Sequence, residues 1–213
     1  RLYIMAFSFG NITHVQPGYF FDCITNFACT IPGIPLNILV LYISMKPNAL
    51  NGATEIRYSI IGMTFYTLYG AIGLSILYSW YLLSLYYNTA MTVLTCSLIR
   101  RILGSTLSSA HISILIVTID RYALIVWNMN FSAVATAVLF GSIFIYVHVI
   151  MNTLQFAFNE FGVEDICGPT AKMPFIASLI VLPVVPLSII AALIMNFCIL
   201  SHLYRYNRKG SFY

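Results

Sequence analysis

Charged residues are scarce in this sequence. Only 8% of the 213 residues are charged, whereas 60% are hydrophobic. Soluble domains carry about 25% charged residues, and no soluble fold of this size buries so much apolar side chain. The scarcity of charge therefore excludes a soluble protein and indicates one that is surrounded by lipid. Basic residues form no cluster large enough for nucleic acid, so we expect no nucleic-acid partner.

Metal ligands and catalytic pairs are also missing. The four histidines are scattered without the spacing of a metal site, so we expect no metal and no cofactor. An integral-membrane enzyme would need paired histidines or acidic residues at one membrane face. The acidic group Glu160, Glu164 and Asp165 has no histidine partner, and we interpret it as a solvated loop. The sequence therefore predicts that the protein is not an enzyme.

Long uncharged runs are what the sequence does contain. They cover residues 23–45, 58–99, 102–119, 122–159 and 173–204. A helix that crosses a bilayer needs roughly 20 apolar residues, and the polar stretches 88–89 and 128–130 divide the two longest runs. We predict a single all-α membrane domain over residues 1–213, with five transmembrane helices at about 22–45, 57–83, 92–127, 131–154 and 173–204. Two proline pairs, Pro32/Pro35 and Pro183/Pro186, are expected to bend the first and fifth helices.

The distribution of basic residues predicts an extracellular N-terminus, because basic residues favour cytoplasmic loops. With this orientation six of the ten basic residues lie inside: Lys46, Arg57, Arg121, Arg205, Arg208 and Lys209. Residues 1–20 then form an extracellular tail and residues 205–213 a cytoplasmic tail. Asn11 begins a glycosylation acceptor triplet on the outer tail, whereas the triplet at Asn130 would be cytoplasmic and unmodified. The chain shows no clear signal peptide and does not begin with Met, so we expect a processed product or a fragment.

Two of the five cysteines fall on the predicted outer side. Cys96 begins the third helix, and Cys167 lies in the loop between the fourth and fifth helices. A disulfide persists in this oxidising compartment. A bridge between these two cysteines would tie the loop across the bundle and contribute about 3–5 kcal/mol to stability.

Asp120 and Arg121 stand together at the predicted cytoplasmic end of the third helix, after the uncharged run 102–119. Charges at membrane depth are costly and usually functional. We expect the two side chains to satisfy each other as an ion pair near the interface. The alternative is a simple helix-end anchor, in which Arg121 reaches toward lipid phosphates.

The spacing along this helix carries a resemblance. Cys96 precedes Asp120 by 24 residues, or about 36 Å of helix, and Asp120, Arg121 and Tyr122 read Asp-Arg-Tyr. In this spacing the helix resembles the third helix of rhodopsin-like (class A) G-protein-coupled receptors, in which an outer cysteine bonded to the second outer loop opens the helix and Asp-Arg-Tyr closes it. The first helix is similar too, with Asn37 placed after Gly33 for helix packing.

Departures from the family pattern are equally clear. The second helix lacks the usual Asp, the fourth lacks Trp, and the fifth lacks the Tyr beyond its prolines. After Tyr122, Asn128 replaces the family's Pro and Phe131 its Tyr. These losses look like those of divergent chemosensory branches, including the nematode serpentine chemoreceptors. Family members have seven helices and this sequence has five, so we expect a partial chain, a truncated product or a remnant.

The resemblance also implies a ligand pocket. Leu103 stands where amine receptors hold an Asp, so a non-amine chemical or peptide ligand is expected. Thr106 and Leu107 lie one turn deeper and are expected to line the same surface. Arg100 has two interpretations: it extends to the outer interface, or it faces the pocket and pairs with an anionic ligand group.

The function implied is a plasma-membrane receptor that signals to a heterotrimeric G protein inside the cell. Ligand binding would favour a state in which Arg121 leaves Asp120 and opens a cytoplasmic cleft. Two alternatives remain at this point. One is a multi-pass transporter or channel subunit, although no internal repeat is visible. The other is a non-signalling remnant that associates with other receptors.

Overall fold

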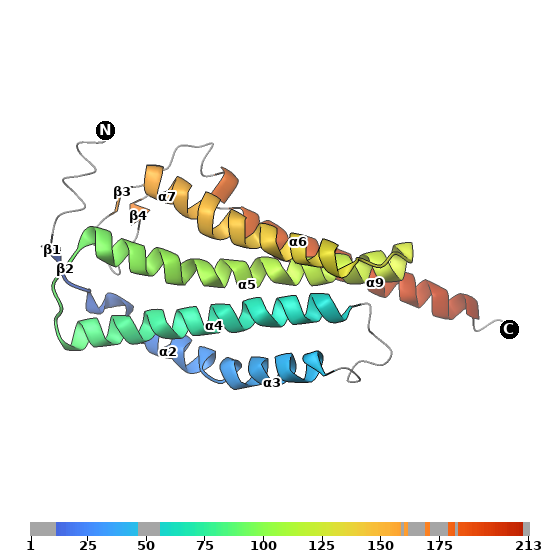
Figure 1. Cartoon of the computed structure of the whole chain (residues 1–213), viewed down its shortest axis with the longest axis horizontal. Coiled ribbons are helices and arrows are strands. Elements are labelled where there is room, and N and C mark those ends of the chain that lie inside the picture. Colours follow the sequence, from blue (N-terminus) through green and yellow to red (C-terminus); the bar gives the residue numbers. More distant parts are fainter. Residues whose placement is uncertain are drawn as a thin grey trace.

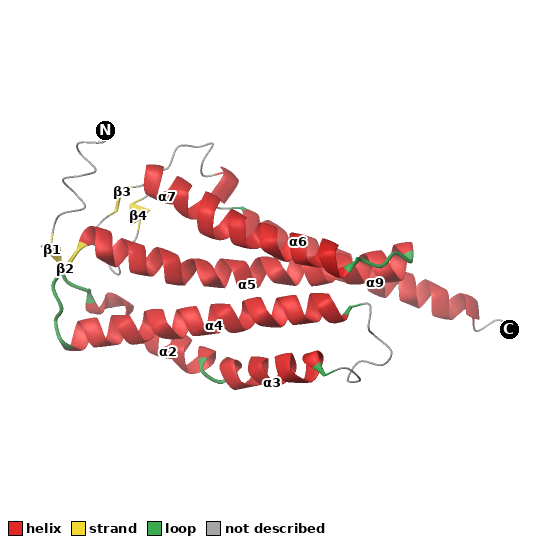
Figure 2. Ribbon diagram, in the orientation of Figure 1, coloured by secondary structure: helices red, strands yellow, loops and turns green. Residues whose placement is uncertain are grey.

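The computed structural model describes residues 12–46, 56–158, 160–161, 169–170, 179–181 and 183–210. The predicted all-α fold is confirmed: long helices make up almost all of the described chain, and its strands have two residues each (Figure 2). The longer helices are α2 (Phe20–Thr30), α3 (Gly33–Met45), α4 (Arg57–Tyr86), α5 (Val93–Trp127), α6 (Ala133–Phe144) and α9 (Val184–Gly210).

Helices α4 and α5 form the centre of the bundle. They lie side by side and share the most extensive contact in the molecule (Figure 1). Helices α2 and α3 pack against α4, while α6 and α9 cover α5. Helix α6 continues without interruption into a π-helix, η2 (Ile145–Met151), and then into α7 (Asn152–Phe158).

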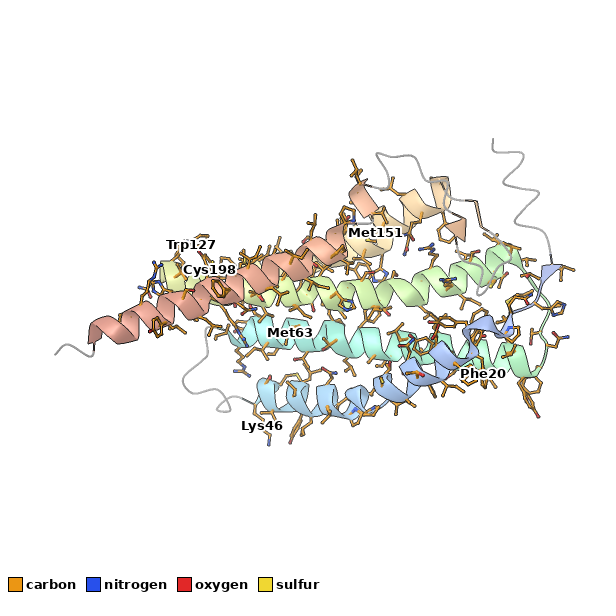
Figure 3. All side chains as sticks on the ribbon, turned by 180° about the vertical axis from the view of Figure 1, so that it is seen from behind. Phe20, Lys46, Met63, Trp127, Met151 and Cys198 are labelled. Carbon is orange, nitrogen blue, oxygen red and sulfur yellow. The ribbon has the colours of Figure 1, made fainter. Side chains whose placement is uncertain are left out.

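The two ends of the bundle differ in chemistry. At one end, which we call the β end, β1 (Ile12–Thr13) pairs antiparallel with β2 (Met91–Thr92), and β3 (Glu160–Phe161) pairs antiparallel with β4 (Pro169–Thr170). The opposite end, which we call the basic end, is defined by Lys46, Arg57, Arg121 and Arg205. Figure 3 shows Lys46 and Trp127 at the basic end and Phe20 toward the β end.

Five helical segments of the described chain are long and apolar enough to cross a membrane. They are Pro17–Met45, Arg57–Tyr86, Val93–Trp127, Ala133–Ala157 and Leu179–Tyr206. Large apolar side chains point outward along them: Val134, for example, is 73% exposed and Phe197 is 71% exposed. In water such a surface would be unfavourable, so length, composition and exposure together indicate a membrane protein.

Local sequence accounts for the ends of the central helix. The hydroxyl of Thr92 accepts a hydrogen bond from the Thr95 amide at 3.2 Å and caps the first turn of α5. At the other end Asn128 adopts a left-handed conformation, with φ of 52°. Asparagine tolerates this conformation, whereas the proline ring fixes φ near −65°. Asn128 therefore terminates α5 in a conformation that a proline at this position would not adopt.

Prolines interrupt both the first and the last predicted helices. The predicted helix 22–45 consists of α2 and α3, which are separated at Ile31 and Pro32 and preceded by a 3₁₀ turn, η1 (Pro17–Tyr19). Pro183 lies directly before α9, and Pro186 lies in its first turn, where no backbone N–H donor is needed. Residues 179–181 are helical and Pro183 forms a bend before α9, in agreement with the bend expected there. Residues 171–178, which the prediction placed in this helix, lie outside the described residues.

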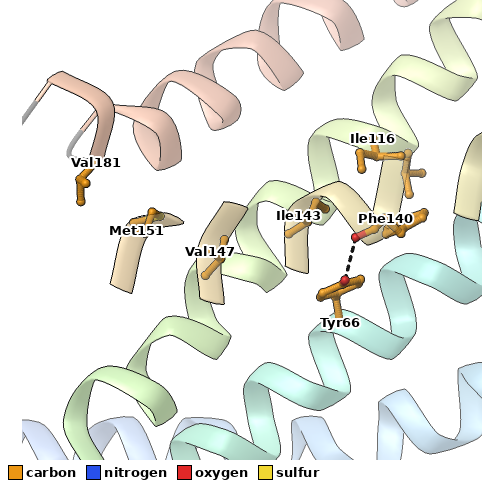
Figure 4. Close-up of a cluster of buried hydrophobic side chains, with 8 residues drawn as sticks. Tyr66, Ile116, Phe140, Ile143, Val147, Met151 and Val181 are labelled. Carbon is orange, nitrogen blue, oxygen red and sulfur yellow. Dashed lines mark hydrogen bonds between the residues drawn. The ribbon is translucent and has the colours of Figure 1, made fainter. Parts of the chain in front are cut away.

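A cluster of buried apolar side chains joins α4, α5 and α6. Tyr66 stacks on Phe140 with ring centroids 5.7 Å apart, and its hydroxyl donates to the Phe140 carbonyl at 2.7 Å (Figure 4). Gly62 makes room for this ring, because a Cβ there would overlap Phe140. Gly73 makes room for Thr106 of α5 in the same way. Small residues of α4 thus let its neighbours approach closely.

Candidate functional site

A cavity of about 250 Å³ opens between α4, α5 and the η2–α7 segment, in the half of the bundle toward the β end. Tyr19, at the end of η1, adds a side chain from the N-terminal segment. Four elements that are distant in sequence therefore build one site.

Two arginines line this cavity. Arg100 and Arg101 are consecutive residues of α5, both half-buried and both inside a predicted membrane span. The guanidinium Nη1 of Arg101 donates to Oε1 of Gln155, on α7, at 2.6 Å. Because the oxygen of Gln155 accepts this bond, its NH₂ group keeps both donors for other partners. Cations at this depth are costly, which makes the pair a functional candidate.

The remainder of the lining is partly polar and partly apolar. Asn152 of α7 and the hydroxyls of Ser105 and Ser108 add uncharged polar groups. The apolar walls are formed by Leu74, Leu77, Leu107 and Met151. No Asp or Glu occurs among the described lining residues. The described lining therefore combines two arginines with uncharged polar groups and apolar walls.

The predicted ligand residues separate into two groups. Arg100 and Leu107 line the cavity. Thr106 is buried in the α4–α5 interface, where its hydroxyl donates to the Leu103 carbonyl at 2.6 Å and its side chain fills the space left by Gly73. Leu103 is half-buried and lies outside the cavity lining.

A polar cluster around His148 was not anticipated from the sequence. This histidine lies in the π-helix η2, and its Nδ1 is 3.1 Å from the Ser105 hydroxyl. Its Nε2 is 3.3 Å from the hydroxyl of Ser109 and 3.4 Å from that of Tyr69. A lone histidine within the uncharged run 122–159 is the signal that would have found it. Ser105 is the member of this cluster that also lines the cavity, whereas His148 lines a neighbouring hollow with Leu98 and Ile102.

Cys96 forms a disulfide and is completely buried at the start of α5. Cys167, its expected partner, lies outside the described residues, so the pairing stays a prediction. The glycosylation site expected at Asn11 also lies outside them. Within the described chain no three His, Cys, Asp or Glu side chains gather in a way that would hold a metal ion.

Asp120 is paired differently from the expectation. It is 2% exposed and accepts a hydrogen bond from the hydroxyl of Ser59, at the start of α4. No ion pair joins it to Arg121 within the described chain, and Arg121 is exposed. The correction has a geometric reason: consecutive residues of a helix do not face each other. Tyr122 is half-buried and packs edge-on against Trp127, with ring centroids 5.2 Å apart.

Asn37 joins α3 to α4. Its amide NH₂ donates to the Gly33 carbonyl at 2.7 Å, and its oxygen accepts from the Thr67 hydroxyl at 2.8 Å. Thr67 of α4 thus supplies the partner that fixes the Asn37 side chain. Near the basic end Arg57 makes a second connection, donating to the Ser44 carbonyl at 2.9 Å and to the Met45 carbonyl at 2.7 Å.

Comparison of the sequence with known proteins assigns the chain to one protein family. No curated protein and no solved structure matches the chain. Residues 4–207, nearly the whole sequence, match the model of a protein family described as "Protein of unknown function (DUF1182)". The chain therefore belongs to this family.

Proposed function

We propose that this protein is a membrane receptor of the G-protein-coupled type, which detects an extracellular non-amine ligand and signals to a heterotrimeric G protein. The observation that carries the proposal is the layout of α5. This single 35-residue helix begins next to a disulfide-bonded cysteine. One turn later it lines the cavity that contains Arg100 and Arg101, which we call the arginine cavity. Near its other end, at the basic end of the bundle, it carries Asp120 and an exposed Arg121. One rigid element therefore connects a ligand-sized cavity to the opposite end of the bundle.

The proposed orientation places the β end outside the cell and the basic end in the cytoplasm. Lys46, Arg57, Arg121 and Arg205 would then lie on the side where basic residues accumulate in membrane proteins. The disulfide at Cys96 would lie in the oxidising exterior. We propose the plasma membrane as the location because a sensor of external chemicals has to meet its ligand there.

The proposed mechanism is a shift between two populations of the bundle. In the state seen here Ser59 holds the carboxylate of Asp120, which fixes the start of α4 to the end of α5. A ligand that binds more tightly to a second arrangement of α4 and α5 would shift the equilibrium toward that arrangement. Arg121 is exposed, so a cytoplasmic protein reaches its guanidinium without further rearrangement.

The proposal is tested by guanine-nucleotide exchange. Purified protein is placed in lipid nanodiscs with a heterotrimeric G protein, and exchange is measured with and without a panel of small water-soluble acids, amides and alcohols. The wild-type chain is expected to accelerate exchange, and Arg121→Ala is expected to abolish the acceleration, because the exposed guanidinium contacts the G protein.

Arg205→Ala serves as the matched control, since Arg205 is another exposed arginine of the basic end; it is expected to retain the acceleration. Unchanged exchange with Arg121→Ala would count against the proposal. Uptake of a panel compound into liposomes that contain the protein would instead favour a transporter, the alternative function.

A further inference from the structure

We infer that the basic end of the bundle is a binding surface for anionic phospholipids, whose headgroups it selects from the surrounding membrane. The inference goes beyond the proposed function, because it concerns the lipid around the bundle and holds for a receptor and for a transporter alike. Three features of the basic end carry it: the sign of its exposed charge, the lack of acidic partners for its cations, and the aromatic side chains among them.

Exposed charge at the basic end has a single sign within the described chain. Lys46, Arg121 and Arg205 are exposed, and Arg57 is half-buried. The one acidic residue described at this end, Asp120, is 2% exposed and hydrogen-bonded inside the bundle. The described surface therefore presents positive charge alone, which is complementary to an anionic membrane surface.

The cations next to α3 are held in place without a described acidic partner. Arg57 of α4 donates to the carbonyls of Ser44 and Met45, at the end of α3. Lys46 follows directly, and its ammonium lies 4.6 Å from the centroid of the Tyr42 ring, as in a cation–π contact. Since no described carboxylate contacts either cation, both charges are open to an anion from the surroundings.

Exposed aromatic side chains indicate the depth at which these cations lie in the membrane. Tyr and Trp gather where helices pass from the hydrocarbon core into the headgroup region. At the basic end the aromatic side chains that are more than half exposed are Tyr42, Tyr58, Trp127, Tyr204 and Tyr206. The apolar spans begin or end beside them. The cations therefore lie at the level of the headgroups, which favours lipid over a soluble acidic protein as the partner.

The two tryptophans of the chain allow the lipid at different depths of the bundle to be measured separately. Trp127 ends α5 at the basic end (Figure 3), whereas Trp80 lies in α4, 23 residues after Arg57, or about 35 Å of helix away. The full chain carrying Trp80→Phe or Trp127→Phe is reconstituted in phosphatidylcholine vesicles. A minor fraction of the lipid is brominated phosphatidylserine or, for comparison, the same fraction of brominated phosphatidylcholine. Because bromine quenches tryptophan fluorescence at contact, quenching measures the lipid beside each reporter.

With Trp127 as the reporter, we expect phosphatidylserine to be enriched about fivefold over phosphatidylcholine. This is the effect of one basic residue near an anionic surface. With Trp80 as the reporter, the two brominated lipids are expected to quench equally. Salt of about 1 M, where the Debye length is about 3 Å, should remove the preference at Trp127 without any substitution.

Substitution of the three exposed cations tests their part in the preference. Lys46→Gln, Arg121→Gln and Arg205→Gln together should abolish the preference at Trp127. Arg57 is kept because its guanidinium holds the end of α3. The matched control combines Arg121→Lys with Arg205→Lys; it keeps the charge and should keep the preference.

Equal quenching of Trp127 by the two lipids, or an equal preference at Trp80, would overturn the inference. So would a preference that survives the glutamine substitutions or high salt, or one that is lost in the lysine control. Absence of the preference together with saturable binding of poly-glutamate would instead assign the basic end to an acidic protein. No G protein is present in these vesicles, so the result does not depend on the receptor proposal.

Discussion

At the scale of single residues, the environment of Asp120 is defined by a side chain from another helix. The sequence places Arg121 next to it, but the hydroxyl of Ser59 is its partner in the fold. Both Asp120 and Ser59 are almost completely buried, with 2% and 1% of their surfaces exposed. The contact therefore links α4 to α5 in a place that water does not reach, where an unsatisfied carboxylate is costly.

Ser59→Ala is expected to destabilise the folded protein by about 1–3 kcal/mol, because it removes a donor from a buried acceptor. The midpoint of unfolding in mixed detergent measures the change. Ser142→Ala is the matched control: Ser142 is an exposed serine of α6 whose hydroxyl bonds only to its own helix, at the Leu139 carbonyl. Equal midpoints for the two variants would show that the Ser59 contact contributes no stability.

Some site residues were predictable one by one, and others were not. Arg100 attracts attention because charge is rare in a membrane span, and the structure places it in the cavity. His148 lies within the fourth predicted helix and Gln155 directly after it, and the contacts of both depend on which face of α5 they meet. That geometry is tertiary and no local pattern encodes it. The side of α5 on which Thr106 lies, at the interface with α4, was likewise not readable from the sequence.

At the scale of helices, the lengths of the uncharged runs located the central helices well. This is because a membrane directly limits the length and composition of any helix that crosses it. The predicted helix 57–83 is α4, residues 57–86, and the predicted helix 92–127 is α5, residues 93–127. The π-helix was not predictable, since its wider turn leaves no mark in hydropathy. Likewise, Pro32 predicted a bend in the first helix, but not that the helix would separate into α2 and α3.

The contact between α4 and α5 depends on Gly73. A Cβ there would overlap the side chain of Thr106, which is β-branched, stiff and 2% exposed. Gly73→Ala is therefore expected to separate the helices and to cost about 1–3 kcal/mol, as overpacking does in other cores. Its unfolding midpoint in mixed detergent should fall.

Gly141→Ala is the control for this substitution. Gly141 lies within α6, and a Cβ there meets nothing within 4 Å. This variant should unfold at the wild-type midpoint or above it, since alanine favours helix. A Gly73→Ala protein as stable as Gly141→Ala would contradict the close approach of α4 and α5.

At the scale of the whole molecule, the two ends of the bundle are predicted to face opposite sides of a membrane. Tyr87, 70% exposed, lies in the turn between α4 and β2, and Met129, 56% exposed, lies between α5 and α6. In a background with Cys23, Cys29 and Cys198 changed to Ser, a membrane-impermeant maleimide should label Tyr87→Cys in intact cells. Met129→Cys should react only after the cells are permeabilised.

Labelling of both positions in intact cells would contradict the membrane crossing of α5. The reverse pattern would keep the crossing but invert the protein, and the arginine cavity would then face the cytoplasm. The experiment therefore checks the orientation that the receptor proposal requires, independently of any ligand.

The π-helix η2 sets which side chain of the following helix, α7, meets Arg101. Residues 152–158 follow it, so a one-codon deletion within 145–151 would turn them about the helix axis by about 100°. Gln155 would then leave Arg101, and a different side chain would stand over the two arginines. The surroundings of the two arginines are therefore set by the register of the fourth helical segment, independently of the contact between α4 and α5.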